Sequence, residues 1–197
     1  MTEKEKAAAG YLYNPNYDME LLVELHKCMD LCYDFNQLRP SQRAEQTDLL
    51  KQILGKMGQQ VYVNAPFFCD YGYNTTVGNN FFANHNCQIL DGGKVTFGDN
   101  VFIAPNCTFT TAEHALDVAQ RNEGLEIALP ITIGNNVWIG AGVTVLGGVT
   151  IGDNTVIGAG SLVTKDIPSG VIAVGVPCKV LREITEDDKN KYPKYQG

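Results

Sequence analysis

Three histidines are the side chains of this 197-residue chain best suited to take a proton near neutral pH: His26, His85 and His114. An imidazole suits general-base chemistry because its ordinary pKa lies close to neutrality. His26 falls among the apolar residues of a predicted helix, where a surface or packing role is the simpler interpretation. His85 is predicted to project from the outer face of a regular repeat, where it is either solvated or lines a site. His114 stands where that repeat is interrupted.

The interruption beside His114 is the stretch from Thr110 to Pro130, TTAEHALDVAQRNEGLEIALP. Downstream of it, apolar residues recur every six positions in IGNNVW, IGAGVT, VLGGVT, IGDNTV and IGAGSL. The upstream series VGNNFF, ANHNCQ, FGDNVF and IAPNCT keeps the same period, with two extra residues near Gly92 and Gly93. A period this short predicts a solenoid in which six residues form one short strand and one turn. Residues 110–130 are then a loop extruded from it.

Residues 1–60 have a helical pattern and are predicted to form a cap on the solenoid. Asp18 precedes apolar residues that recur at intervals of three and four, which predicts a capped helix. Ser41, which follows Pro40, is predicted to cap a second helix and complete a hairpin. The solenoid is then expected over 61–184, and a tail over 185–197.

Composition narrows the possible partners. The net charge of -7 and the pI near 4.9 argue against nucleic acid and against anionic membranes, because both are bound mainly through Lys and Arg. The sequence contains neither a long apolar run nor a signal-peptide pattern, so a cytoplasmic protein is expected. Its six cysteines form no C-x-x-C pair and have no histidine at zinc-like spacing, so no metal site is predicted and reduced thiols are expected.

Several motifs resemble those of the maltose and galactoside O-acetyltransferases, almost from end to end and closest to the maltose enzymes: CDYGYN, GNNFFAN, PITIGNNVWIGAGV, GVTIGDNTVIGAGSLVTKDIP and GVPCKVLREI. The resemblance implies an all-β core, a left-handed parallel β-helix with three hexapeptides per coil, beneath the amino-terminal helical hairpin. Parallel crossovers are usually right-handed, so the handedness rests on the resemblance alone. With three hexapeptides per coil, Cys69, Cys87 and Cys107 are predicted to form one column of buried, free thiols.

The function that the resemblance implies is acetyl transfer from acetyl-CoA to a hydroxyl of a maltose, glucose or galactoside-type sugar, in a ternary complex. Acetyl-CoA is then a donor substrate, with no tightly bound cofactor. A homotrimer with active sites between its subunits is also implied. Two alternatives remain: acetylation of an antibiotic or other xenobiotic, and a non-catalytic β-helix scaffold. His114 and the cations Lys165 and Arg182 argue against a scaffold, and the full-length likeness favours sugars.

The resemblance also implies roles for individual residues. His114 aligns with the general base, and the backbone N–H of Ala141 with the oxyanion donor. The implied acceptor-binding residues are Asp70, Asn84, Asp91, Glu126 and Trp138. The implied coenzyme A contacts are Ala141, Ala159, Thr164, Lys165, Lys179 and Arg182. Turn capping is the alternative for Asn84 and Asp91, and Glu126 either orients His114 or is a solvated loop charge.

Overall fold

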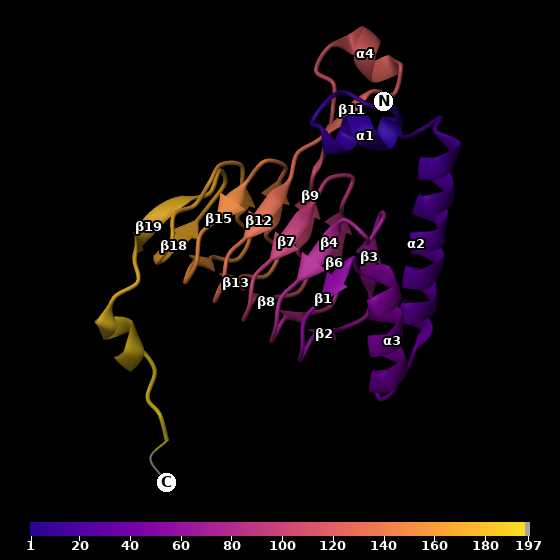
Figure 1. Ribbon diagram of the computed structural model, residues 1–197. Coiled ribbons are helices and arrows are strands. Elements are labelled where there is room, and N and C mark those ends of the chain that lie inside the picture. Colours follow the sequence, from indigo (N-terminus) through magenta and orange to yellow (C-terminus); the bar gives the residue numbers. More distant parts are fainter. Residues whose placement is uncertain (196–197) are drawn as a thin grey trace.

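The computed structural model describes residues 1–195 as a three-sided, left-handed parallel β-helix with helices packed against its first coils (Figure 1). The first face contains β1 (Lys56–Met57), β4 (Thr75–Val77), β7 (Val95–Phe97), β12 (Ile131–Ile133) and β15 (Thr150–Ile151). The second face contains β2 (Tyr62–Val63), β5 (Phe82–Ala83), β8 (Phe102–Ile103), β13 (Trp138–Ile139), β16 (Val156–Ile157), β18 (Val171–Val174) and β19 (Lys179–Glu183). The third face contains β3 (Phe67–Cys69), β6 (Cys87–Leu90), β9 (Thr108–Thr110), β14 (Thr144–Leu146) and β17 (Leu162–Val163).

The six-residue period places one apolar side chain of every hexapeptide inside the prism. The inward residues Val77, Phe97, Ile133, Ile139 and Val163 are at most 2% exposed. Burying each such side chain stabilises the fold by about 1.5–3 kcal/mol relative to leaving it in water. The period therefore encodes a single continuous core.

Asparagines form the corners between the first and second faces. Asn80, Asn100, Asn136 and Asn154 all have φ between 53° and 57°, a region that asparagine tolerates better than most side chains. The side-chain amides of the first three donate to the oxygen of the next asparagine along the stack at 2.9 Å. The G-N-N and G-D-N triplets thus both turn the chain and link successive coils.

Coil length changes along the chain, and this corrects one prediction from the sequence. Phe67 pairs with Cys87, 20 positions later, whereas Cys69 pairs with Ile89. The early coils therefore already contain 20 residues, so Cys69 lies outside the column that contains Cys87. The reason is that the corner after β3, Tyr71 to Asn74, is as long as the corner near Gly92. All six cysteines are buried with free thiols.

The amino-terminal helices cover the start of the β-helix (Figure 1). They are α1 (Glu3–Ala8), α2 (Met19–Gln37) and α3 (Arg43–Ile53). Asp18 caps α2 as predicted, because its side chain accepts a hydrogen bond from the Leu21 N–H at 2.9 Å. The predicted Ser41 cap is wrong: Gln42 occupies the N-cap of α3 and its side chain makes no capping hydrogen bond. Within residues 1–195, no helix is both long and apolar enough to cross a membrane.

The extruded loop leaves the coil at the corner between the third and first faces. It contains β10 (Ala112–His114), α4 (Val118–Asn122) and β11 (Glu126–Ala128), and β10 and β11 form an antiparallel hairpin. The same corner holds the longer turns after β3 and β6, so the loop extends the widest edge of the prism. At the opposite end of the molecule, η1 (Glu186–Asn190) follows β19 (Figure 1).

Candidate functional site

The β10–β11 hairpin places His114 directly opposite Glu126. The two side chains meet on one side of the hairpin, where His114 Nδ1 lies 3.6 Å from Glu126 Oε1. The imidazole is 62% exposed and the carboxylate only 16%. A separation of 3.6 Å is too long for a hydrogen bond, but it is close enough for the two charges to interact. Burial raises the pKa of Glu126, and the nearby His114 partly offsets that rise.

Asp70 joins this pair from the coil. It follows β3 on the third face, at the same end of the face from which the extruded loop leaves. Burial raises the pKa of Asp70 to about 6, and the negative charges of Asp91 and Glu126 add to the rise. Glu126 is therefore within electrostatic range of both Asp70 and His114, and this cluster combines two segments more than 40 residues apart in the sequence.

Asp91 lies beneath this cluster and has no contact with solvent. Its Oδ1 accepts a hydrogen bond from the Tyr71 N–H at 2.8 Å, and its Oδ2 accepts one from the Thr75 hydroxyl at 2.9 Å. The carboxylate thus holds the turn that follows Asp70. The structure gives Asp91 the turn-capping geometry that the sequence left as the alternative to acceptor binding.

A groove beside Asp70 offers space for a ligand. It has a volume of about 690 Å³ and lies between α2 and β3, where it is lined by Met29, Tyr33, Phe68 and Asp70, among others. Volumes in this range are typical of small-molecule sites. Its lining combines one carboxylate with apolar and aromatic surface.

The remaining candidate polar residues lie outside this cluster. Asn84 follows β5 at the corner before β6, and its Oδ1 accepts a hydrogen bond from the His85 N–H at 2.8 Å. His85 is exposed at the same corner, and His26 is exposed on α2. Only one of the three histidines, His114, therefore stands beside a carboxylate within hydrogen-bonding or ion-pairing range among residues 1–195.

Ala141 and Ala159 stack at the corner between the second and third faces. The Gly160 N–H donates to the Ala141 carbonyl at 2.8 Å, whereas the Ala141 N–H meets no acceptor in residues 1–195. A Cβ at Gly140 would lie 2.5 Å from the Ala159 nitrogen, so only glycine allows this close stacking. The corner thus presents backbone donors on an open edge.

This corner lies at the opposite end of the third face from His114. Ala141 precedes β14, while the His114 loop follows β9, and these two strands pair in parallel register. Within one chain, the sequence-predicted base and the sequence-predicted oxyanion donor are therefore separated by the length of a strand.

The predicted coenzyme A cations gather on the last coils. Lys165 follows β17. The Cys178 N–H donates to the carbonyl of Leu162 in β17 at 2.7 Å. This bond brings the next residue, Lys179, close to the same strand. Thr164, Lys165 and Lys179 are exposed. Arg182 is paired within the chain: its Nη2 lies 2.7 Å and its Nη1 2.8 Å from the two carboxylate oxygens of Asp188. That pairing lowers the pKa of Asp188.

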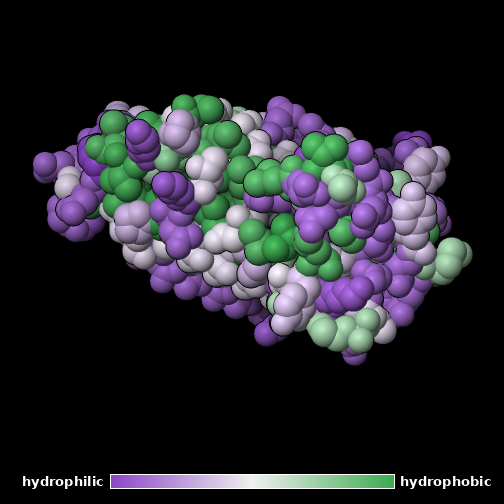
Figure 2. Space-filling model, turned by 90° about the horizontal axis from the view of Figure 1, so that it is seen from above, coloured by the Kyte–Doolittle hydropathy of each residue, from purple (hydrophilic) through white to green (hydrophobic). Residues whose placement is uncertain are grey.

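An aromatic column covers the second face, and sequence analysis identified only one of its members. Tyr62, Phe82, Phe102 and Trp138 stand in register on β2, β5, β8 and β13. Three of them, Tyr62, Phe102 and Trp138, expose 42–55% of their surface. Each of the four stands directly before the inward residue of its hexapeptide. This shared position could have predicted the column from the sequence. Further apolar surface lies beside the extruded loop and at the carboxyl-terminal end (Figure 2), where Leu116, Val118, Val180 and Leu181 are exposed.

The arrangement suits acid–base chemistry on a small polar ligand. A histidine beside a half-buried carboxylate can accept a proton on its far nitrogen. In residues 1–195, no group of three or more His, Cys, Asp or Glu side chains is arranged to hold a metal ion.

Comparisons with known families match both parts of the chain. Residues 6–58 match a family model described as the maltose acetyltransferase hexapeptide capping motif. Residues 130–165 match a model described as bacterial transferase hexapeptide, six repeats. The two matches correspond to the helical cap and to the regular coils after the extruded loop.

Solved structures are similar over almost the whole chain. A maltose O-acetyltransferase from Clostridium difficile 630 is 49% identical with a TM-score of 0.92, and the match covers 94% of this chain and 99% of that one. A galactoside acetyltransferase in complex with coenzyme A is 45% identical with a TM-score of 0.94, covering 98% and 96%. A hexapeptide-repeat acetyltransferase from Vibrio cholerae O1 biovar eltor, complexed with acetyl coenzyme A, is 34% identical with a TM-score of 0.86, covering 94% and 100%.

Proposed function

The chain belongs to the maltose and galactoside O-acetyltransferase family of hexapeptide-repeat enzymes, and from this we propose that it transfers an acetyl group from acetyl-CoA to a sugar hydroxyl with His114 as the general base. The observation that carries the proposal is the pairing of His114 with Glu126. A base needs an accessible nitrogen and a fixed ring. The exposed imidazole supplies the accessible nitrogen, and in this proposal the Glu126 carboxylate, which is held in a hairpin strand, orients the ring.

The proposed chemistry is a direct transfer. With Nδ1 turned toward Glu126, the Nε2 of His114 takes the proton of the acceptor hydroxyl as the oxygen attacks the thioester carbon. The tetrahedral intermediate then collapses, the carbon–sulfur bond breaks, and the imidazolium returns the proton to the departing thiolate. Atoms and charge balance without a metal or a redox cofactor.

A sugar acceptor is supported by Asp70, whose carboxylate lies within the electrostatic influence of Glu126. Asp70 borders a groove of about 690 Å³ that also contains Tyr33 and Phe68. Carboxylates accept paired hydrogen bonds from neighbouring sugar hydroxyls, while the apolar wall suits the ring face or an apolar substituent of the sugar. Asn84 and Asp91 have little part in this proposal, because their side-chain oxygens are engaged in turns.

The proposed donor contacts lie on another part of the chain. We assign stabilisation of the oxyanion to the N–H of Ala141, which meets no acceptor in the described part of the chain. Ala159, Thr164, Lys165, Lys179 and Arg182 line the route proposed for coenzyme A. Because Ala141 lies a strand's length from His114 in one chain, we propose that a neighbouring subunit completes each site. The exposed aromatic column on the second face supports a homotrimer, since contiguous exposed aromatic surface favours an interface.

Acetyl-CoA consumption across a panel of sugars, amines and antibiotics tests this function. Wild-type enzyme is expected to acetylate at least one maltose, glucose or galactoside-type sugar, and His114→Ala to lose about 10²–10⁴-fold in kcat. His26→Ala, an exposed histidine on α2, is the matched control and should retain full activity. A preference for amines or antibiotics would contradict the sugar assignment. No turnover with any acceptor would favour a scaffold, and full activity of His114→Ala would exclude the proposed base.

A further inference from the structure

Tyr13, in the segment between α1 and α2, pairs with β11 through an isolated β-bridge. The Tyr13 N–H donates to the Glu126 carbonyl at 2.9 Å, and the Glu126 N–H donates to the Tyr13 carbonyl at the same distance. Glu126 is therefore the central residue of a three-residue row, with His114 on one side and Tyr13 on the other. The residue proposed to orient the base is held by backbone hydrogen bonds from the amino-terminal region.

Two asparagines extend this attachment to the turn of the loop. The Asn14 side chain donates to the Glu123 carbonyl at 2.7 Å, and the Asn16 side chain donates to the Gly124 carbonyl at 3.1 Å. Gly124 has φ +82°, which explains the glycine at the turn just before β11. Residues 13–16, here called the N-terminal clamp, thus bind the loop at three residues: Glu123, Gly124 and Glu126.

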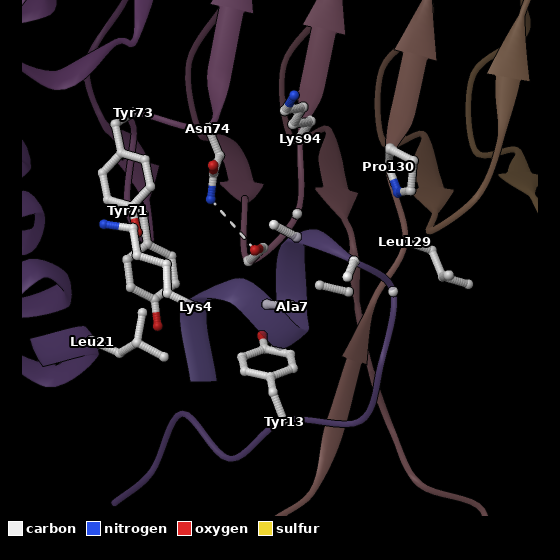
Figure 3. A pocket seen from close by; sticks show the side chains of 16 residues that line it. Lys4, Ala7, Tyr13, Leu21, Tyr71, Tyr73, Asn74, Lys94, Leu129 and Pro130 are labelled. Atoms are coloured by element: carbon white, nitrogen blue, oxygen red, sulfur yellow. Dashed lines mark hydrogen bonds between the residues drawn. The ribbon is translucent and has the colours of Figure 1, made fainter. Parts of the chain in front are cut away.

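The N-terminal clamp is itself anchored to the coil and to α1. Tyr13 is 2% exposed and packs with Ala7, Leu21, Tyr71 and Ala128. Figure 3 shows the Tyr13 ring below α1, at the edge of a cavity of about 400 Å³ that is also lined by Lys4, Tyr71 and Asn74. A Cβ at Gly92 would approach the Tyr13 hydroxyl to 2.8 Å, so the glycine leaves room for the ring. The Asn14 N–H also donates to the Glu3 carboxylate at 2.6 Å.

A two-stranded hairpin alone is only marginally stable in water. The hairpin that carries His114 has a five-residue helix at its tip, and within residues 1–195 its sheet consists of β10 and β11 alone. The N-terminal clamp adds the Tyr13 bridge and two side-chain hydrogen bonds, and it joins the hairpin to the β-helix because Tyr13 packs with Tyr71. We infer that the N-terminal clamp is a positioning element that fixes Glu126, and through it the imidazole of His114, in the geometry for proton transfer. This inference rests on the function proposed above.

The double variant Asn14→Ala/Asn16→Ala tests the inference, because it removes two side-chain ties while leaving the buried Tyr13 ring and the backbone pairing in place. We expect kcat with the fastest sugar of the panel to fall about 5- to 20-fold, with the KM for acetyl-CoA unchanged. Arg121 is exposed on α4, so trypsin should cut after it several times faster.

The matched control is Asn79→Ala. This exposed asparagine accepts a hydrogen bond from the Gln59 N–H at 2.9 Å, on a corner far from the loop in the fold, and its loss should leave kcat and trypsin cleavage unchanged. Faster cleavage with an unchanged kcat would overturn the positioning role, as would a matching loss of activity in Asn79→Ala or a parallel rise in the KM for acetyl-CoA. Full activity of His114→Ala would instead refute the proposed base, and the cleavage assay would still report on the clamp.

Discussion

His114 and Glu126 face each other across the β10–β11 hairpin, with Nδ1 of the imidazole 3.6 Å from Oε1 of the carboxylate. The relationship is set by strand register, because directly opposed residues of an antiparallel pair place their side chains on the same side. A slip of one residue would move the two side chains to opposite faces of the hairpin. The register is therefore a functional property of the loop.

Glu126→Gln is expected to lower kcat by about 10- to 100-fold, because it removes the carboxylate charge that faces the imidazole and each tenfold in rate corresponds to about 1.36 kcal/mol of barrier. The KM for acetyl-CoA should remain close to that of the wild type, since Glu126 is far from the carboxyl-terminal cations in the fold. Steady-state kinetics of both substrates measure the effect. Glu113→Gln, an exposed neighbour of His114 on β10, is the control. An equal loss in the two variants would mean that loop charge in general, and not this pair, matters.

Asp70→Asn is expected to stabilise the protein at alkaline pH. The pKa of Asp70 is raised to about 6 from 3.8, so the folded state holds its proton more tightly than the unfolded state. The contribution of Asp70 to the free energy of unfolding is complete below about pH 4, where the carboxyl is protonated in both states. This contribution is lost as the pH rises through about 6 and the carboxyl of the folded protein ionises. The variant should therefore exceed the wild type in unfolding free energy by about 1–2 kcal/mol at pH 8, with little difference at pH 4.

Urea unfolding at pH 4 and pH 8 measures this difference. Asp30→Asn, at an exposed site on α2, is the control for loss of a carboxylate. The same Asp70→Asn variant should also lose catalytic efficiency for the sugar, because it removes an acceptor of hydroxyl hydrogen bonds. A stabilisation of equal size at both pH values would contradict the linkage.

Trp138→Glu is expected to dissociate the proposed trimer, because it places a charge in the exposed aromatic column of the second face. Light scattering should then report a monomer, and activity should fall together with assembly. Thr132→Glu introduces the same charge at an exposed position of the first face and should leave the assembly intact. A monomeric wild type with full activity would refute the shared site.

Asp188→Asn is expected to lower the KM for acetyl-CoA by about two- to fivefold, because it frees Arg182 from its carboxylate partner. Lys179→Ala should act in the opposite direction by removing a cation from the proposed phosphate route. Asp187→Asn, an exposed neighbour in η1, controls for the change in net charge. If Asp188→Asn and Asp187→Asn changed the KM for acetyl-CoA equally, the change in net charge would be responsible, and not the release of Arg182.

Local regularities made much of the fold predictable. The six-residue period identified the inward residues, such as Ile133 and Ile139, because one apolar side chain per strand must face the core. Asp18 was recognisable as a cap because capping depends on a residue and its next three neighbours. Ser41 failed on the same reasoning, because the N-cap is Gln42, one residue beyond Ser41, and α3 begins at Arg43. The Cys69 column failed because corner length between strands is not fixed by the period.

The site divides in a similar way. By itself, the sequence determined where the coil is interrupted and that His114 stands at the interruption, because both follow from the order of residues along the chain. Only the tertiary structure decided that Asp91 is buried beneath Asp70, that Arg182 is held by Asp188, and that Tyr13 pairs with Glu126. These contacts join residues that are far apart in the sequence and are brought together by the stacking of coils and by strand register. Neither composition nor periodicity predicts which distant segments of backbone will lie side by side.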